Sequence, residues 1–158
     1  MKNHTLFIPL FTFMVLFQSA ISQNLSTDFP QELTQTDSLY LIVLEHYIKE
    51  FPSKIKNNNL YIEHSTITHR LPGQIKGVNI VKLKDSELKK KVRKSTKLYL
   101  VYVEPLSFND GTFSITLTPK LIKKKGVKLN ISTSDWITGV FVFKNNKLKL
   151  DNVAISGI

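Results

Sequence analysis

The chain contains no cysteine, so it can form neither a disulfide bond nor a thiolate nucleophile, and no lipid can be attached to a processed cysteine. The small disulfide-stabilised scaffolds of the extracellular space are therefore excluded, and packing alone must hold the fold. Long apolar runs are also scarce. After residue 22, none approaches the roughly 20 residues that a membrane-spanning helix needs.

The first 22 residues have the three parts of a secretory signal peptide. Lys2 gives a cationic start, residues 6–17 are apolar, and residues 20–22 form a small-residue exit that favours cleavage after Ser22. The apolar stretch is shorter than a bilayer-spanning helix, and an uncleaved anchor is the alternative. The pattern predicts an exported protein, periplasmic or extracellular, with no transmembrane span after cleavage.

Arginine is scarce although the chain is strongly basic. The net charge is +10, which becomes +9 when Lys2 leaves with the signal, and Arg70 and Arg93 are its two arginines. A guanidinium group grips phosphate or carboxylate with two prongs, whereas a lysine presents a single point charge. Such a surface attracts polyanions, but a lysine excess is also typical of ordinary solvated charge.

Catalytic and cofactor motifs are absent as well. The chain has no Gly-x-Ser-x-Gly elbow, no phosphate-binding Walker loop and no dinucleotide fingerprint. His64 and His69 would point to opposite faces of a straight strand, so a metal site there would need a bend and a third ligand. We therefore expect no catalytic residue, no metal, no cofactor and a non-enzymatic role.

The mature chain has the usual size of one domain. Residues 23–35 are polar, contain Pro30 and show no lasting period, which predicts a flexible leader before a single domain over residues 36–158.

A helix is predicted at the start of this domain. Thr34 or Thr36 can cap it, Asp37 lies in its first turn, and Pro52 ends it. Its broad apolar stripe follows helical spacing and needs a sheet or a second helix to cover it. The stripe consists of Leu39, Tyr40, Val43, Leu44, Tyr47, Ile48 and Phe51.

The middle of the chain has one predicted strand and one short helix. Residues 60–67 have strand character, and Gly73 and Gly77 bracket a predicted loop. Asp85 can cap a short helix whose other positions are mostly lysine, so this helix can bury only a narrow strip.

The last third is β-rich. Residues 98–103 are apolar on both faces, which indicates a central strand, and residues 109–111 and 145–146 are turn signals. Alternation predicts strands over residues 113–118 and 127–131, residues 136–144 form another, and Leu148 and Leu150 lie in a final strand or tail. The pattern predicts an α+β fold, in which an N-terminal helix and a short basic helix pack on a four- to six-stranded antiparallel meander sheet.

Residues 139–157 (GVFVFKNNKLKLDNVAISG) resemble the closing hairpin of small cystatin-like and NTF2-like domains. The chain is also similar to small exported bacterial proteins of unknown function that begin with a signal and end in such a hairpin. This resemblance lies in the order of elements and implies a cone-like α+β fold, which hosts enzymes, ligand binders and scaffolds alike.

Three binding roles follow from these observations. The first is binding of a partner protein or envelope component by an exported module. The second is a small-ligand pocket between the first helix and the sheet, lined by Tyr40, Tyr47, Phe113, Phe141 and Phe143. The third is polyanion binding through two lysine clusters, formed by Lys89, Lys90 and Lys91 and by Lys123, Lys124 and Lys125. Aromatic residues do not interleave with these lysines, which disfavours nucleic acid.

Overall fold

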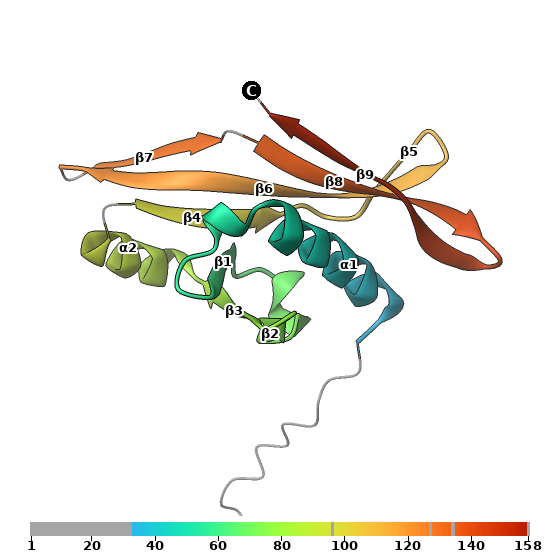
Figure 1. Ribbon diagram of the computed structural model, residues 1–158, viewed down its shortest axis with the longest axis horizontal. Coiled ribbons are helices and arrows are strands. Elements are labelled where there is room, and N and C mark those ends of the chain that lie inside the picture. The colour runs from blue at the N-terminus through green and yellow to red at the C-terminus, as the bar shows by residue number, and fades with distance from the viewer. Residues whose placement is uncertain (1–32, 96, 127, 134, 158) are drawn as a thin grey trace, which may run out of the picture. The chain divides into compact units, whose positions relative to one another are not determined.

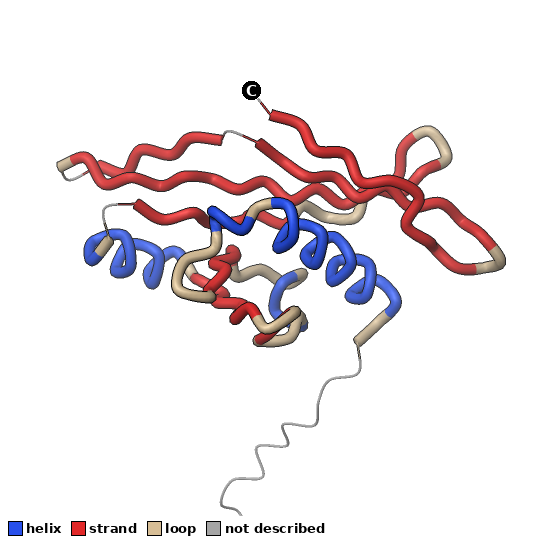
Figure 2. Tube along the Cα trace, viewed as in Figure 1, coloured by secondary structure: helices blue, strands red, loops and turns tan. Residues whose placement is uncertain are grey.

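The computed structural model describes residues 33–95, 97–126, 128–133 and 135–157. The predicted signal peptide and most of the predicted leader lie outside the described residues. Figure 1 labels the helices and strands, and Figure 2 shows that strands make up most of the described chain. In chain order these are α1 (Gln35–Glu50), the 3₁₀ turn η1 (Pro52–Lys54), β1 (Asn59–Glu63), the 3₁₀ turn η2 (Thr68–Arg70), β2 (Gln74–Ile75), β3 (Val78–Leu83), α2 (Asp85–Lys94), β4 (Lys97–Val103), β5 (Ser107–Asn109), β6 (Thr112–Lys125), β7 (Lys128–Thr133), β8 (Asp135–Lys144) and β9 (Lys147–Gly157).

The strands form one mixed sheet, which corrects the predicted fold class. Nine strands join in the order β2-β3-β1-β4-β6-β8-β9, with β5 and β7 also paired to β6. β1 is parallel to both β3 and β4, whereas β4, β6, β8 and β9 pair antiparallel. The predicted antiparallel meander of four to six strands is therefore wrong in strand number and in strand direction.

Most of the error arises between residues 64 and 83, and β5 is a further strand that we did not predict. We expected one strand over residues 60–67, but β1 ends at Glu63, because the Thr68 hydroxyl bonds the Glu63 carbonyl at 2.6 Å and turns the chain out of the sheet. The predicted loop between Gly73 and Gly77 instead contains β2 and the two-residue turn of a β2–β3 hairpin, with positive φ at Lys76 and Gly77. α2 then carries the chain from β3 across to β4, and such a crossover makes these strands parallel.

β6 is the longest strand, at 14 residues, and it lies inside the sheet between β4 and β8. Lys120 pairs with Thr133 of β7, whereas Leu117 pairs with Ile137 of β8, so the pairing shifts by one residue between them. Pro119 lies at this shift. A proline cannot donate a ladder hydrogen bond, and in sheets it is usual at such irregularities.

α1 begins at a Thr34 cap, which is one of the two caps that the sequence allowed. The Asp37 backbone N–H donates to the Thr34 hydroxyl at 3.2 Å, and the Thr34 backbone N–H donates to the Asp37 carboxylate at 2.9 Å. Arg70 from η2 donates to the other carboxylate oxygen at 3.0 Å. The cap therefore also ties the helix to the segment that follows β1.

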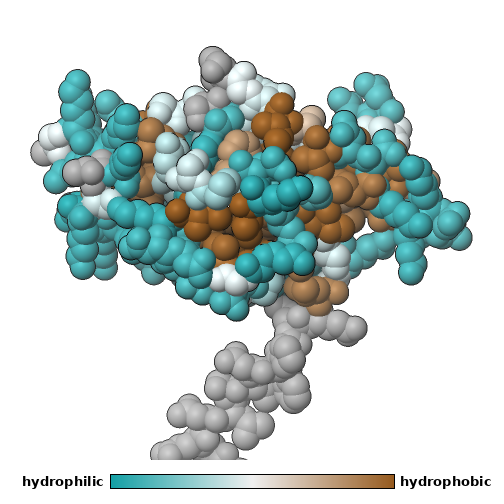
Figure 3. Space-filling view, in the orientation of Figure 1, coloured by the Kyte–Doolittle hydropathy of each residue, from teal (hydrophilic) through white to brown (hydrophobic). Residues whose placement is uncertain are grey.

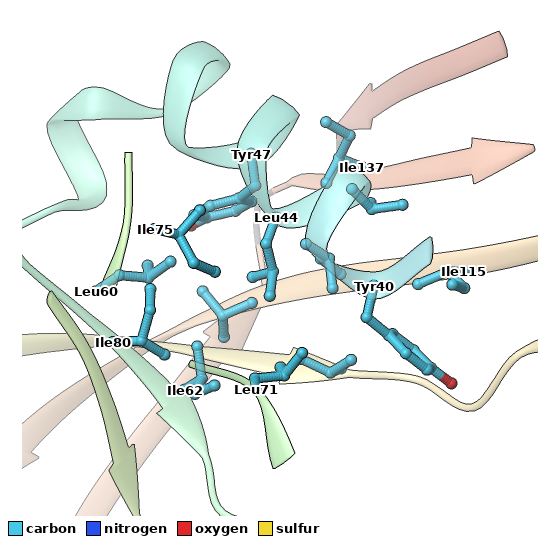
Figure 4. Close-up of a cluster of buried hydrophobic side chains, with 14 of the residues drawn as sticks. Tyr40, Leu44, Tyr47, Leu60, Ile62, Leu71, Ile75, Ile80, Ile115 and Ile137 are labelled. Carbon is cyan, nitrogen blue, oxygen red and sulfur yellow. The ribbon is translucent and has the colours of Figure 1, made fainter. Parts of the chain in front are cut away.

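One face of the sheet carries α1 and the larger core. Tyr40, Leu44 and Tyr47 of α1 are buried against Leu60 and Ile62 of β1 together with side chains of β2, β3, β4, β6 and β8 (Figure 4). The helix lies close to β8 at Gly139. A Cβ atom there would lie 2.5 Å from Cγ2 of Val43, so this glycine is required for helix contact rather than for backbone conformation.

The other face carries α2 and a smaller core. Because side chains alternate along β4, Val101 and Val103 join the α1 core while Leu98 and Leu100 join Leu88 and Val92 of α2. β4 is therefore covered on both faces, as its apolar sequence predicted. Among the described residues, no helix is long and apolar enough to cross a membrane.

We predict that Gly139→Ala destabilises the domain by about 1–3 kcal/mol, because the new methyl group overlaps Val43. Urea unfolding measures the change. Val43→Ala, made alone and combined with Gly139→Ala, completes a double-mutant cycle. The glycine substitution should cost less in the Val43→Ala background, and equal costs in both backgrounds would contradict the contact.

We also predict an acid-dependent loss of stability at the α1 cap. Burial raises the pKa of Asp37, but hydrogen bonds from Thr34 and the charge of Arg70 outweigh it and hold the pKa below the usual 3.8. The ionised carboxylate therefore stabilises the fold above the unfolded pKa, and this contribution is lost as pH falls through the folded pKa. Asp37→Asn should cost about 1–3 kcal/mol at pH 7 and flatten the decline in stability below pH 4, measured by urea titration at each pH.

Candidate anion-binding site

The two predicted lysine clusters meet in one pocket. Lys89 and Arg93 of α2 and Lys124 of β6 line a cavity of about 260 Å³, and Gly126 and Leu129 are the other described residues in its lining. We call this the α2–hairpin pocket. Figure 1 shows α2 and the β6–β7 hairpin at the same end of the sheet, and Figure 3 shows hydrophilic residues gathered over that end.

Helix geometry explains which α2 residues reach this pocket. Leu88 and Val92 are buried against the sheet, and a helix turns by about 100° per residue. Lys89 and Arg93, each one position later, therefore lie together on the flank of α2 that borders the hairpin. Lys90 lies about 100° further round the helix axis, on the exposed side of the helix.

Strand geometry explains why a single lysine of the second cluster contributes. Side chains alternate along β6, so Lys124 shares the face of buried Ile122, which packs with α2. Lys123 and Lys125 project from the opposite face. Of the six predicted anion-binding residues, Lys89 and Lys124 are thus brought together, and Arg93 is a pocket residue that the prediction omitted.

The other flank of α2 borders a second basic pocket, which we call the α2–β1 pocket. Lys91 and Lys94 of α2 and Lys56 line this cavity of about 240 Å³, together with Tyr61. The Lys91 ammonium lies 5.0 Å from the centre of the Tyr61 ring and covers it. The same helix therefore presents cations on both of its flanks.

No carboxylate neutralises these charges within the described part of the chain. The ion pairs there use Lys49, Lys54, Arg70, Lys76 and Lys144. The unneutralised cations around the helix form what we call the α2 belt: Lys56, Lys89, Lys90, Lys91, Arg93, Lys94 and Lys124.

The two arginines have different roles. Arg70 is occupied by Asp37 in the α1 cap, whereas Arg93 faces the α2–hairpin pocket. Lys91, Arg93 and Lys94 also lie in the last turn of α2, where cations offset the partial negative charge of the helix end. Arg93 is thus the arginine available for two-pronged binding of an anion.

Lys54 is basic but belongs to the interior. Its ammonium pairs with Asp135 and lies 4.6 Å from the centre of the Phe51 ring. Burial lowers the pKa of this lysine. Lys54 therefore links the end of α1 to the start of β8 and is not part of the belt.

The five predicted aromatic residues divide between core and surface. Tyr40, Tyr47 and Phe141 are buried in the core between α1 and the sheet. Phe113 is half-buried, with its ring centre 4.7 Å from that of Phe108, and Phe143 is 64% exposed. Ligand binding by these residues stays a prediction, and the space beneath α1 that we assigned to a ligand holds core side chains.

The chain does bend between the two histidines, which is one of the two features that a metal site there would need. The chain turns after β1, and the rings of His64 and His69 lie 6.0 Å apart. No third histidine, cysteine or carboxylate completes a metal-binding group among the described residues.

Comparison with known proteins adds no assignment to this geometry. No protein-family model matches the chain, and no curated protein matches it significantly. The function must therefore be argued from the site itself.

The core offers a test of its packing at Tyr47. The Tyr47 hydroxyl is buried without a hydrogen-bond partner among the described residues, and burial raises its pKa far above 10. Because an unpaired buried hydroxyl is costly, Tyr47→Phe should stabilise the domain by about 1 kcal/mol in urea unfolding. Tyr40→Phe is the control, since the Tyr40 oxygen accepts from Leu106 N–H at 2.8 Å and its loss should destabilise.

Proposed function

We propose that this domain is an exported binding module for an anionic ligand, held in the α2–hairpin pocket. The convergence of Lys89, Arg93 and Lys124 from two separate segments on one cavity supports this most directly. Three cations around one cavity repel one another unless an anion or solvent ions screen them. The signal-like N-terminus supports export, and export gives the domain access to envelope or extracellular anions.

The pocket suits a phosphate, sulfate or carboxylate group. Arg93 supplies a planar fork, while Lys89 and Lys124 supply point charges from two sides. The binding free energy would be mainly electrostatic, because the lining residues are exposed, and affinity should fall steeply with salt. An anionic component of the cell envelope satisfies both this proposal and the expected role in envelope binding.

Lys124 and Lys123 provide a matched test. They are adjacent and exposed on β6, and replacement of either by glutamate changes the net charge equally. Lys124 lines the pocket and Lys123 does not. Lys124→Glu should therefore weaken heparin binding roughly tenfold more than Lys123→Glu at about 0.15 M salt. Heparin chromatography and calorimetry measure the difference.

Circular dichroism and urea unfolding serve as controls for folding of both variants. Equal weakening by the two substitutions would indicate attraction by net charge alone and would contradict a specific pocket. Arg93→Lys keeps the charge but removes the fork, so a measurable loss there would support two-pronged binding.

A further inference from the structure

The two basic pockets lie on opposite flanks of one helix. The α2–hairpin pocket uses Lys89 and Arg93, and the α2–β1 pocket uses Lys91 and Lys94. Each pocket also has one cation from outside α2, Lys124 in the first and Lys56 in the second. The pockets are therefore separate in their linings but adjacent around the helix.

The exposed side of α2 connects these pockets without a negative charge. Lys90 follows Lys89 by one position and lies between the two flanks of the helix, and Lys94 lines the α2–β1 pocket. The carboxylates of α2, Asp85 and Glu87, are confined to its first turn. The cationic surface is thus continuous over the C-terminal half of the helix.

From this geometry we infer that the ligand is a linear acidic polysaccharide that crosses α2 and occupies both pockets at once, an inference that rests on the proposed function. A helix with its side chains is about 10–12 Å wide, so one small anion cannot reach both pockets. A chain with charges at regular intervals can, and its second contact then forms at high effective concentration.

The linings favour a polysaccharide over nucleic acid. Binding of single-stranded nucleic acid without sequence preference relies on aromatic rings that stack against bases. The α2–hairpin pocket has no aromatic residue in its described lining, and in the α2–β1 pocket Lys91 covers the face of Tyr61. Point charges from lysine need no stacking, and they fit sulfate or carboxylate groups along a sugar chain.

A length series of heparin oligosaccharides tests the bridging. The wild-type protein should bind a decasaccharide at least tenfold more tightly than a tetrasaccharide, measured by calorimetry at constant salt. Lys124→Glu and Lys56→Glu should each abolish most of this length advantage. Lys90→Glu should weaken the decasaccharide and leave the tetrasaccharide nearly unchanged, with Lys123→Glu as the charge-matched control.

Each outcome has a distinct meaning. Equal affinity for both lengths, with Lys124→Glu still weakening both, would overturn the bridging and leave the proposed function standing. Failure of Lys124→Glu to weaken either oligosaccharide more than Lys123→Glu would overturn the proposed function itself. Tighter binding of a single-stranded DNA of matched charge, at the same salt, would overturn the polysaccharide assignment.

Discussion

The burial of α1 against the sheet is the contact on which the rest of the structure depends. Its apolar side packs on β1 and β3 of the parallel half and on β6 and β8 of the antiparallel half, so one helix holds both halves in a single core. The close approach at Gly139 fixes where the helix lies. With no cysteine in the chain, packing of this kind must supply the stability that disulfides provide in many small exported proteins.

The same sheet positions the charges. Pairing of β4 with β6 places the β6–β7 hairpin beside α2, because β4 begins just after α2 and its first residues pair with the end of β6. Alternation along β6 then directs Lys124 toward the helix and its neighbours away from it. The run Lys123–Lys125, which looks uniform in the sequence, is thereby divided into one pocket residue and two opposite-face residues. The use of Arg70 in the α1 cap leaves Arg93 for the pocket.

Local signals in the sequence were sufficient where structure is decided locally. The Thr34 cap, the helical stripe of α1 and the Asn145-Asn146 turn were all predictable, because capping, periodicity and positive φ depend on neighbouring residues. The parallel pairing of β1 with β3 and β4 was not predictable. It depends on a hairpin of two short strands and on a helical crossover. The lysine clusters were recognised as segments, but which of their members meet depends on helix and strand faces that only the fold defines.

The position of Gly139 has a consequence for how the chain acquires its structure. α1 precedes every strand of the described residues, yet the glycine against which it rests lies in β8, which follows β1 to β7 along the chain. Contacts between such distant segments form slowly, because a long loop must close first. A chain that stops at β6 would lack the contacts that Ile137, Gly139 and Phe141 of β8 make with this core, so the core is complete only after β8 has been added.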